Sequence, residues 1–152
     1  MLIFLLRHGR AEANAESDKA RKLTQDGMLR NESVIQQFKL RSPTVDRMLT
    51  SPYLRAQQTA AAVNALFPNL EGEECSALVP DIDVQELLDF VEKTKVQNLL
   101  LIGHNPLLSN LLSILVDGTS ETNRELGTST LVCVKMDFIA PGCGDISYSL
   151  QP

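Results

Sequence analysis

Short apolar runs recur along this chain and are separated by polar segments that contain Gly, Pro, Asn or Ser. Runs of four to eight apolar residues that end at such breakers are typical of buried strands. The pattern predicts strands at residues 1–6, 45–49, 98–102, 128–136 and 145–150. Between the last two runs, Ala140-Pro141-Gly142 is a turn signal, and it predicts an antiparallel hairpin at the edge of the sheet.

Apolar residues at helical spacing occupy most of the intervals between these runs. Ser51 is expected as the N-cap of one helix, with Pro52 at its first position. Residues 10–22 and 68–80 are polar or irregular, with a short extended piece expected at 77–79. Helices are predicted after Thr24 and before Pro43, from Ser51-Pro52 to near Pro68, over 84–95, and from Pro106 to 116.

Alternation of strands and helices predicts the fold class. It indicates an α/β protein, a three-layer α/β/α sandwich around a mostly parallel sheet. Since the 152 residues contain no repeat, low-complexity tract or long linker, we expect one domain over 1–152. The run 99–116 is interrupted by Gly103, His104, Asn105 and Pro106, which favours a strand, a turn and a helix over a membrane span.

Composition and charge exclude several classes of function. The net charge of −5 argues against a nucleic-acid binder. Three cysteines, Cys75, Cys133 and Cys143, form no close pair, so neither a disulfide framework nor a zinc site is indicated. The apolar start of the chain is too short for a signal peptide. We therefore expect a reduced, cytoplasmic protein without a metal, a cofactor or a membrane partner, and a monomer.

The candidate chemistry lies where two of the apolar runs end. The chain has two histidines, and His8 and His104 each directly follow a predicted strand. The carboxyl ends of strands in an open α/β sheet are where ligands bind. In Arg7-His8-Gly9, arginine offers a fork of donors for phosphate oxygens, and neutral histidine can act as a nucleophile. His104 could donate a proton to a phosphoryl oxygen.

Arg55 adds a second cation near the same edge. It follows a predicted strand and turn and falls in the first turns of a helix, where backbone donors already favour an anion. Taken alone, Arg55 could be an ordinary solvated helix residue, and His104 could be a buried capping histidine. Two arginines and two histidines at three strand ends instead indicate one anion-binding catalytic site.

Four motifs carry a resemblance to a known family. Leu6-Arg7-His8-Gly9, Leu23-Thr24-x-x-Gly27, the block from Thr50 to Thr59 (TSPYLRAQQT) and Gly103-His104-Asn105-Pro106 occur in this order. The chain thereby resembles the histidine phosphatase superfamily, which has a phosphoglycerate-mutase-like fold, and within it the small bacterial SixA-type phosphohistidine phosphatases. The resemblance spans nearly the full length.

The resemblance implies roles for individual residues. His8 would attack phosphorus and become transiently phosphorylated, while Arg7, Arg55 and His104 would clamp the phosphoryl oxygens. Arg21, which precedes Leu23-Thr24, matches an arginine of the closer family and would help to bind the phosphate. Because fixed cationic donors supply the charge, such a mechanism needs no metal.

The leaving group separates the possible substrates. Asp81 and Asp83 are the nearest candidates for a general acid, although either could simply cap the helix that follows. A phosphohistidine nitrogen can take its proton from water, so we expect a phosphohistidine-bearing protein as substrate, such as a histidine-phosphotransfer domain or a phosphotransferase-system protein. A small-metabolite phosphomonoesterase using Asp81 and a non-catalytic phosphate-binding adaptor remain the alternatives.

Overall fold

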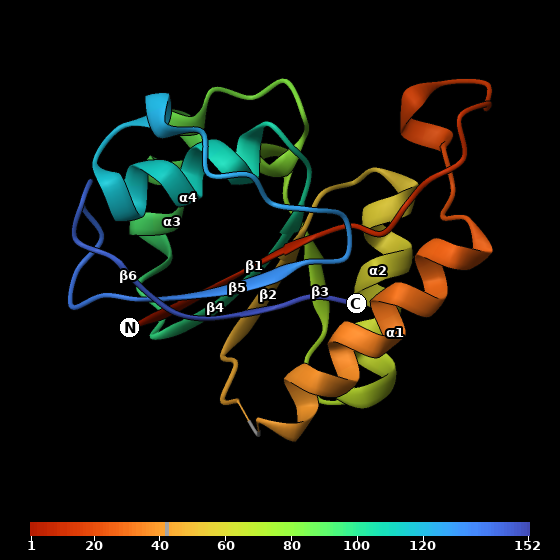
Figure 1. Cartoon of the computed structure of the whole chain (residues 1–152), viewed down its shortest axis with the longest axis horizontal. Coiled ribbons are helices and arrows are strands. Elements are labelled where there is room, and N and C mark those ends of the chain that lie inside the picture. The colour runs from red at the N-terminus through yellow and green to blue at the C-terminus, as the bar shows by residue number, and fades with distance from the viewer. Residues whose placement is uncertain (42) are drawn as a thin grey trace.

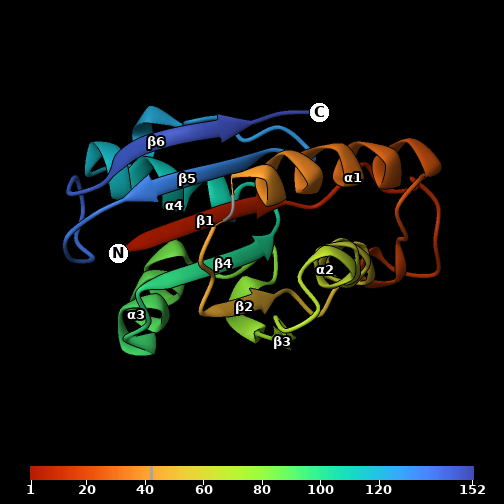
Figure 2. The ribbon, with the colours of Figure 1, turned by 90° about the horizontal axis from the view of Figure 1, so that it is seen from below.

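A mixed six-stranded sheet forms the centre of the molecule in a computed structural model that describes residues 1–41 and 43–152. The strand order is β3-β2-β4-β1-β5-β6, which Figure 2 shows across the sheet. β5 runs antiparallel to β1, and β6 runs antiparallel to β5, whereas β3, β2, β4 and β1 are parallel. The strands are β1 (Leu2–Arg7), β2 (Arg47–Thr50), β3 (Gly72–Glu74), β4 (Asn98–Gly103), β5 (Leu131–Lys135) and β6 (Asp145–Leu150).

Helices cover both faces of this sheet, as the predicted three-layer sandwich requires (Figure 1). Side chains alternate across a strand, so Phe4 and Leu6 of β1 pack toward α1 and α2, and Ile3 and Leu5 pack toward α3 and α4. The predicted α/β fold class is confirmed. The helices are α1 (Gln25–Leu40), α2 (Leu54–Leu66), α3 (Val84–Thr94) and α4 (Leu107–Asp117), with short 3-10 turns at Asp18–Ala20, Ser76–Leu78 and Ser120–Thr122.

Most predicted elements are confirmed to within a few residues. The N-cap of α1 is Thr24, whose hydroxyl accepts a hydrogen bond from the Gly27 amide. The predicted closing hairpin is β5–β6 at the edge of the sheet. Cys133 is buried in β5, as its apolar surroundings indicated. Among the described residues, no helix is long and apolar enough to cross a membrane.

The start of α2 differs from the prediction. Tyr53, not Ser51, is the N-cap, so Pro52 lies in the preceding turn instead of the helix. The chain uses residues 51–53 to turn away from the end of β2, and the Ser51 hydroxyl bonds to His104. The buried face of α2 comprises Arg55, Ala56, Thr59, Ala60 and Val63. α4 begins one residue later than predicted, at Leu107, with Pro106 as its N-cap.

The prediction of a short extended piece at 77–79 is wrong. Ser76–Leu78 is a 3-10 turn, and the strand in this region is Gly72–Glu74. Ala77 and Leu78 are buried because the turn folds them onto the core, so their apolar character did not mark a strand. β3 is an edge strand whose Glu73 and Glu74 are exposed, and the apolar pattern therefore missed it.

Two close glycine contacts fix the loop after β1. A Cβ on Gly9 would lie 2.6 Å from the Gly27 carbonyl oxygen, and a Cβ on Gly27 would collide with the backbone of Arg10. Arg10 is itself held, because its carbonyl accepts hydrogen bonds from the amide and hydroxyl of Thr24. The start of α1 therefore sets the path of the chain on either side of Gly9.

We expect Gly27→Ala to destabilise the protein by about 1–3 kcal/mol, since the clash is with backbone that is held in place. At an unobstructed helical position the same change would stabilise by about 0.5–1 kcal/mol. Urea unfolding measures the difference. Gly103→Ala is the matched control, because its Cβ would meet side-chain carbons at 3.5 Å, which is ordinary contact. Equal stability of the Gly27→Ala and wild-type proteins would contradict this account of the loop.

Candidate active site

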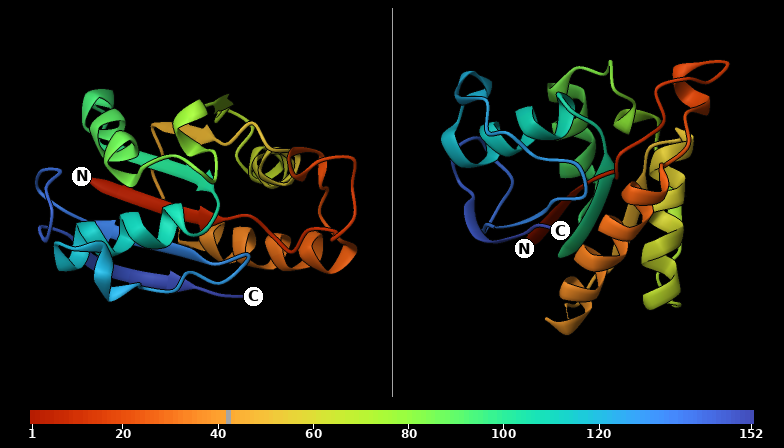
Figure 3. Two further views of the ribbon diagram at one scale, coloured as in Figure 1. Left: turned by 90° about the horizontal axis from the view of Figure 1, so that it is seen from above. Right: turned by 45° about the vertical axis from the view of Figure 1, so that its right-hand side comes forward.

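The carboxyl ends of β1, β2 and β4 meet at one edge of the sheet. Arg7 pairs with Gly103, and Thr50 pairs with Ile102, so these three strands end in register. The hydrogen bonds continue one residue further, from the His8 amide to the Gly103 carbonyl at 3.1 Å and from the Ser51 amide to the Ile102 carbonyl at 3.0 Å. The segment 10–22 projects beyond the amino end of α2 at this edge (Figure 3).

The hydrogen bonds of His8 show that its proton is on Nδ1 and that Nε2 is unprotonated. Nδ1 lies 2.6 Å from the Gly9 carbonyl oxygen. Since a carbonyl can only accept, Nδ1 carries the proton, and the lone pair of Nε2 faces Arg55, whose Nε donates to it at 3.1 Å. Burial first, and then the charges of Arg55, Arg7 and Arg21, lower the pKa of His8 to about 4, although the hydrogen bond to Gly9 raises it. His8 is therefore neutral at pH 7.

His104 lies beside His8 and is more deeply buried. The two ring centroids are 4.8 Å apart, and the Tyr53 ring meets His104 edge-on at 5.1 Å. Nε2 of His104 lies 2.7 Å from the Ser51 hydroxyl, while Nδ1 is buried without a hydrogen-bond partner among the described residues. Burial, and then repulsion from Arg55 and from His8 when His8 is itself protonated, lower the pKa of His104 to about 3.

Arg7 is oriented by the loop that precedes β5. Its Nη1 donates to the Leu126 carbonyl at 2.8 Å, and the Asn105 side-chain amide donates to the same oxygen at 2.9 Å. Nε of Arg7 is buried and has no partner within the described part of the chain. Burial lowers the pKa of Arg7, partly offset by Glu125. The guanidinium therefore retains an unused donor at the end of β1.

Arg55 and Arg21 meet at Asp18. Arg55, which is 5% exposed, donates from Nη1 to the Asp18 carbonyl at 2.6 Å and from Nη2 to the Asp18 carboxylate at 3.0 Å. Arg21 donates to the other carboxylate oxygen at 3.0 Å and to the Glu12 carbonyl at 2.5 Å. Although partial burial raises the pKa of Asp18, the hydrogen bonds from Arg21 and Arg55 outweigh it and lower the pKa.

A buried polar network joins the backbones of His8 and Arg55. The Ser129 amide donates to the His8 carbonyl at 3.2 Å, and the Ser129 hydroxyl donates to the Asn31 side chain at 2.8 Å. Asn31 in turn donates to the Thr59 hydroxyl at 2.9 Å, which donates to the Arg55 carbonyl at 2.8 Å. Asn31 of α1 thus ties the loop after β1 to α2.

The structure brings together Arg7, His8, Arg55 and His104, the four residues predicted as catalytic. Arg21 joins them indirectly, through Asp18. Asp83 is the N-cap of α3 and accepts from the Gln85 amide at 2.7 Å. Asp81 is exposed, and no hydrogen bond or ion pair among the described residues links it to this cluster.

Sequence reasoning missed the residues that hold the cluster in place: Asp18, Ser51 in its contact with His104, Asn31 and Ser129. Asp18 carried a weak signal, because it lies one helical turn before Arg21 in a polar segment. Asn31 is fully buried within α1, but a single asparagine in an amphipathic pattern does not reveal its partners.

The arrangement is suited to an oxyanion. The Arg55 guanidinium donates to the lone pair of a neutral imidazole, the charges of Arg7 and Arg21 also act on that ring, and arginine forks match the oxygens of phosphate. Such fixed cations can stabilise charge that develops during transfer of a phosphoryl group. Within the described residues, no group of three His, Cys, Asp or Glu side chains is placed to hold a metal ion.

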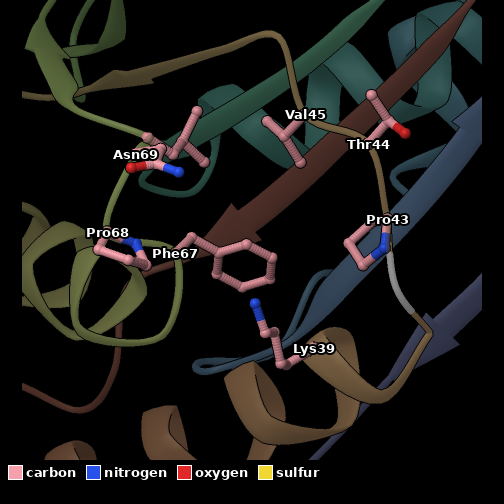
Figure 4. Close-up of a pocket in the computed structure, with 8 residues that line it drawn as sticks. Lys39, Pro43, Thr44, Val45, Phe67, Pro68 and Asn69 are labelled. Atoms are coloured by element: carbon pink, nitrogen blue, oxygen red, sulfur yellow. The ribbon is translucent and has the colours of Figure 1, made fainter.

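A separate pocket of about 300 Å³ lies at the opposite end of the sheet (Figure 4). It is lined around the start of β2 by Val45 and around the end of α2 by Phe67, whereas Arg55 lies at the start of α2. In Figure 4 the Lys39 side chain points toward the Phe67 ring, and its ammonium lies 4.5 Å from the centroid of that ring. This pocket offers one cation among apolar groups and amides, so it has no chemistry comparable to that of the His8 cluster.

The two histidines make stability depend on pH. Both folded pKa values lie below the ordinary value of 6.5, so below that pH the unfolded chain takes up protons that the folded protein does not. We expect the free energy of unfolding to fall between pH 6.5 and pH 5 by about 1.4 kcal/mol per pH unit for each histidine once its unfolded form is protonated. Urea unfolding at pH 7, 6 and 5 measures this. The His8→Asn variant should show about half the slope, and a flat profile would contradict the burial of neutral histidines.

Comparison with known proteins agrees with this geometry. Residues 3–78 match the model of the histidine phosphatase superfamily (branch 1). The Escherichia coli protein called phosphohistidine phosphatase SixA is 31% identical over 157 residues, which cover 100% of this chain and 94% of that protein. A SixA homolog from Haemophilus influenzae is 46% identical over 72 residues, 44% of each chain.

Solved structures extend the similarity to three dimensions. A structure of the protein histidine phosphatase SixA complexed with tungstate superposes with a TM-score of 0.87 at 30% identity, covering 100% of this chain and 97% of that one. The alpha-ribazole phosphatase from Shigella flexneri has a TM-score of 0.73 at 19% identity and shares the fold. The chain belongs to the histidine phosphatase superfamily.

Proposed function

We propose that this chain is a phosphohistidine phosphatase that removes the phosphoryl group from a histidine of another protein through a covalent phosphohistidine at His8. The observation that carries the proposal is the state of His8, which is neutral and has its Nε2 lone pair directed at the Arg55 guanidinium. The curated relatives in Escherichia coli and Haemophilus influenzae are called phosphohistidine phosphatases, and this supports the same substrate class here.

In the first step, Nε2 of His8 attacks phosphorus, and the P–N bond to the substrate histidine breaks as the new P–N bond forms. The leaving imidazole nitrogen takes a proton from solvent. In the second step, water attacks phosphorus, the bond to His8 breaks, and inorganic phosphate leaves. Because Nδ1 of His8 remains bonded to the Gly9 carbonyl, the ring keeps its orientation through both steps.

The surrounding cations hold the phosphoryl group in this proposal. Arg7 offers its free Nε, and Arg55 is already directed at Nε2 of His8. His104 donates to a phosphoryl oxygen from beside the His8 ring. Arg21 binds phosphate after its carboxylate partner, Asp18, gives way to the substrate.

The proposed substrate matches the carboxyl groups that the described residues place near His8. Asp18 lies in the cluster, but its hydrogen bonds to Arg21 and Arg55 lower its pKa, so it is ionised and does not serve as a proton donor. Cleavage of an alkyl phosphate requires an acid to protonate the leaving oxygen, whereas a phosphohistidine nitrogen is basic enough to be protonated from water. Asp83 is engaged in capping α3, and Asp81 is exposed, with no hydrogen bond or ion pair to the cluster among the residues that the structure describes. We infer that a histidine-phosphotransfer domain or a phosphotransferase-system protein is the substrate, that no metal takes part, and that the chain acts in the cytoplasm, where its free cysteines stay reduced.

Phosphate release from different substrates tests the proposal. With EDTA present, we expect rapid release from a phosphohistidine-bearing phosphotransfer protein and release at least about 100-fold slower from phosphoserine peptides and sugar phosphates, as loss of a general acid predicts. Efficient hydrolysis of sugar phosphates that Asp81→Asn abolishes would instead identify a metabolite phosphomonoesterase. Phosphate binding without turnover of either class would identify an adaptor.

A further inference from the structure

The contact between Ser51 and His104 has a consequence for how the second histidine works. We propose that Ser51 is a positioning residue that fixes His104 in the tautomer with its proton on Nδ1, so that a proton donor is presented to the phosphoryl group. The tautomer follows from the hydrogen bonds alone, while its use in phosphoryl transfer rests on the proposed function.

Counting the hydrogen bonds of the Ser51 hydroxyl decides which partner donates. The Ser51 oxygen already accepts a hydrogen bond from the Tyr53 amide at 3.3 Å, and it lies 2.7 Å from Nε2 of His104. If Nε2 carried the proton, the Ser51 oxygen would accept twice, and its own proton would have no acceptor among the described residues. If the Ser51 hydroxyl donates to Nε2, every polar group of Ser51 is used.

The burial of both residues makes this choice costly to reverse. Ser51 is fully buried and His104 is 1% exposed, so water does not reach the hydroxyl to take up an unused proton. Each buried polar group without a partner costs stability, and the Nε2–H tautomer would leave two of them, the Ser51 proton and the Nδ1 lone pair, whereas the Nδ1–H tautomer leaves only the Nδ1 proton. The backbone also holds Ser51 in place, because its carbonyl accepts from the Gln57 side chain at 2.8 Å and its amide donates to Ile102 at 3.0 Å.

With Nε2 accepting, Nδ1 of His104 is a buried N–H donor without a partner among the described residues. Nε of Arg7, at the end of the neighbouring strand, is in the same condition. Two unpaired donors at adjacent strand ends suit an incoming oxyanion, whereas an unprotonated Nδ1 would repel it. The neutral state of His104 at pH 7 means that the tautomer, and not an added proton, decides whether this nitrogen donates.

Nitrogen-15 NMR of the imidazole rings tests the tautomer directly, without substrate. The chain contains only two histidines, so the spectrum holds two ring systems, and the His8→Ala variant assigns them. We expect both rings of the wild-type protein to be neutral with the proton on Nδ1. A wild-type His104 with its proton on Nε2 would overturn the proposal, whatever the behaviour of any variant.

The Ser51→Ala variant tests the role of the hydroxyl. We expect His104 to shift toward the Nε2–H tautomer while His8 keeps its Nδ1–H signal, and we expect kcat to fall roughly tenfold with little change in KM. Ser113→Ala is the matched control, because it removes an equally buried hydroxyl that contacts only backbone groups of Ser109 and Arg124. Retention of a pure Nδ1–H tautomer in Ser51→Ala would show that Ser51 does not set it.

The NMR measurement tests the role of Ser51, and the turnover measurement tests the proposed function, so either proposal can fail without the other. If the tautomer is as expected but phosphohistidine is not hydrolysed, the proposed substrate is wrong and the role of Ser51 stands for another phosphoryl compound. If phosphohistidine is hydrolysed but His104 carries its proton on Nε2, the proposed function stands and the inference about Ser51 fails.

Discussion

His8→Ala is expected to lower the turnover of a phosphohistidine protein by on the order of 10⁴-fold or more, because the reaction then has no group to accept the phosphoryl group covalently. In the structure, the His8 ring is neutral, and the lone pair of its Nε2 faces the Arg55 guanidinium. Phosphate release under single-turnover conditions measures the effect.

The binding of inorganic phosphate separates loss of the nucleophile from loss of the site. Arg7 and Arg55 are held by contacts that do not depend on the His8 ring, since Arg7 bonds to Leu126 and Arg55 bonds to Asp18. The His8→Ala protein should therefore fold and still bind phosphate. Turnover within tenfold of the wild type would exclude His8 as the nucleophile.

Arg55→Ala is expected to have the second largest effect, a loss of about 10²–10³-fold in kcat/KM. The guanidinium donates to His8 from Nε and to Asp18 from both Nη atoms, so one side chain orients the nucleophile, the loop and the anion site. Arg55→Lys should restore little of the lost activity, because one ammonium group cannot make the three hydrogen bonds that the guanidinium makes at once.

Arg30→Ala is the matched control for this charge. Arg30 lies on the exposed surface of α1, where it pairs with Asp26, and its loss should leave kcat/KM unchanged within about twofold. A loss in Arg55→Ala no larger than that in Arg30→Ala would show that Arg55 has no part in the reaction. The Arg55→Ala protein should also be cleaved faster by trypsin after Lys19, because Asp18 loses its anchor on α2.

Much of the candidate site could be predicted because its residues lie at the ends of buried strands. The apolar runs before Arg7 and Gly103 identify β1 and β4, and parallel pairing of those strands necessarily brings His8 and His104 to the same edge. The position of Arg55 was harder to predict, because α2 begins two residues later than the Ser51-Pro52 signal indicates. Its place in the first turn was nevertheless correct.

The contacts that hold the site could not be predicted from the pattern of the chain. Asn31, Thr59 and Ser129 come from distant segments and interact only after the helices pack on the sheet. Ser51 was interpreted as a helix cap because serine before proline commonly serves that purpose. Its hydroxyl bonds instead to His104, a partner fixed by the pairing of β2 with β4.

The covalent intermediate is the central claim, and its direct test is to mix the protein with a phosphohistidine substrate carrying ³²P, quench within milliseconds in base, and map the labelled peptide. We predict an acid-labile, base-stable phosphoryl group on His8 that forms and decays at rates matching the release of phosphate. Release of phosphate without any labelled protein, or a label on another residue, would contradict the account.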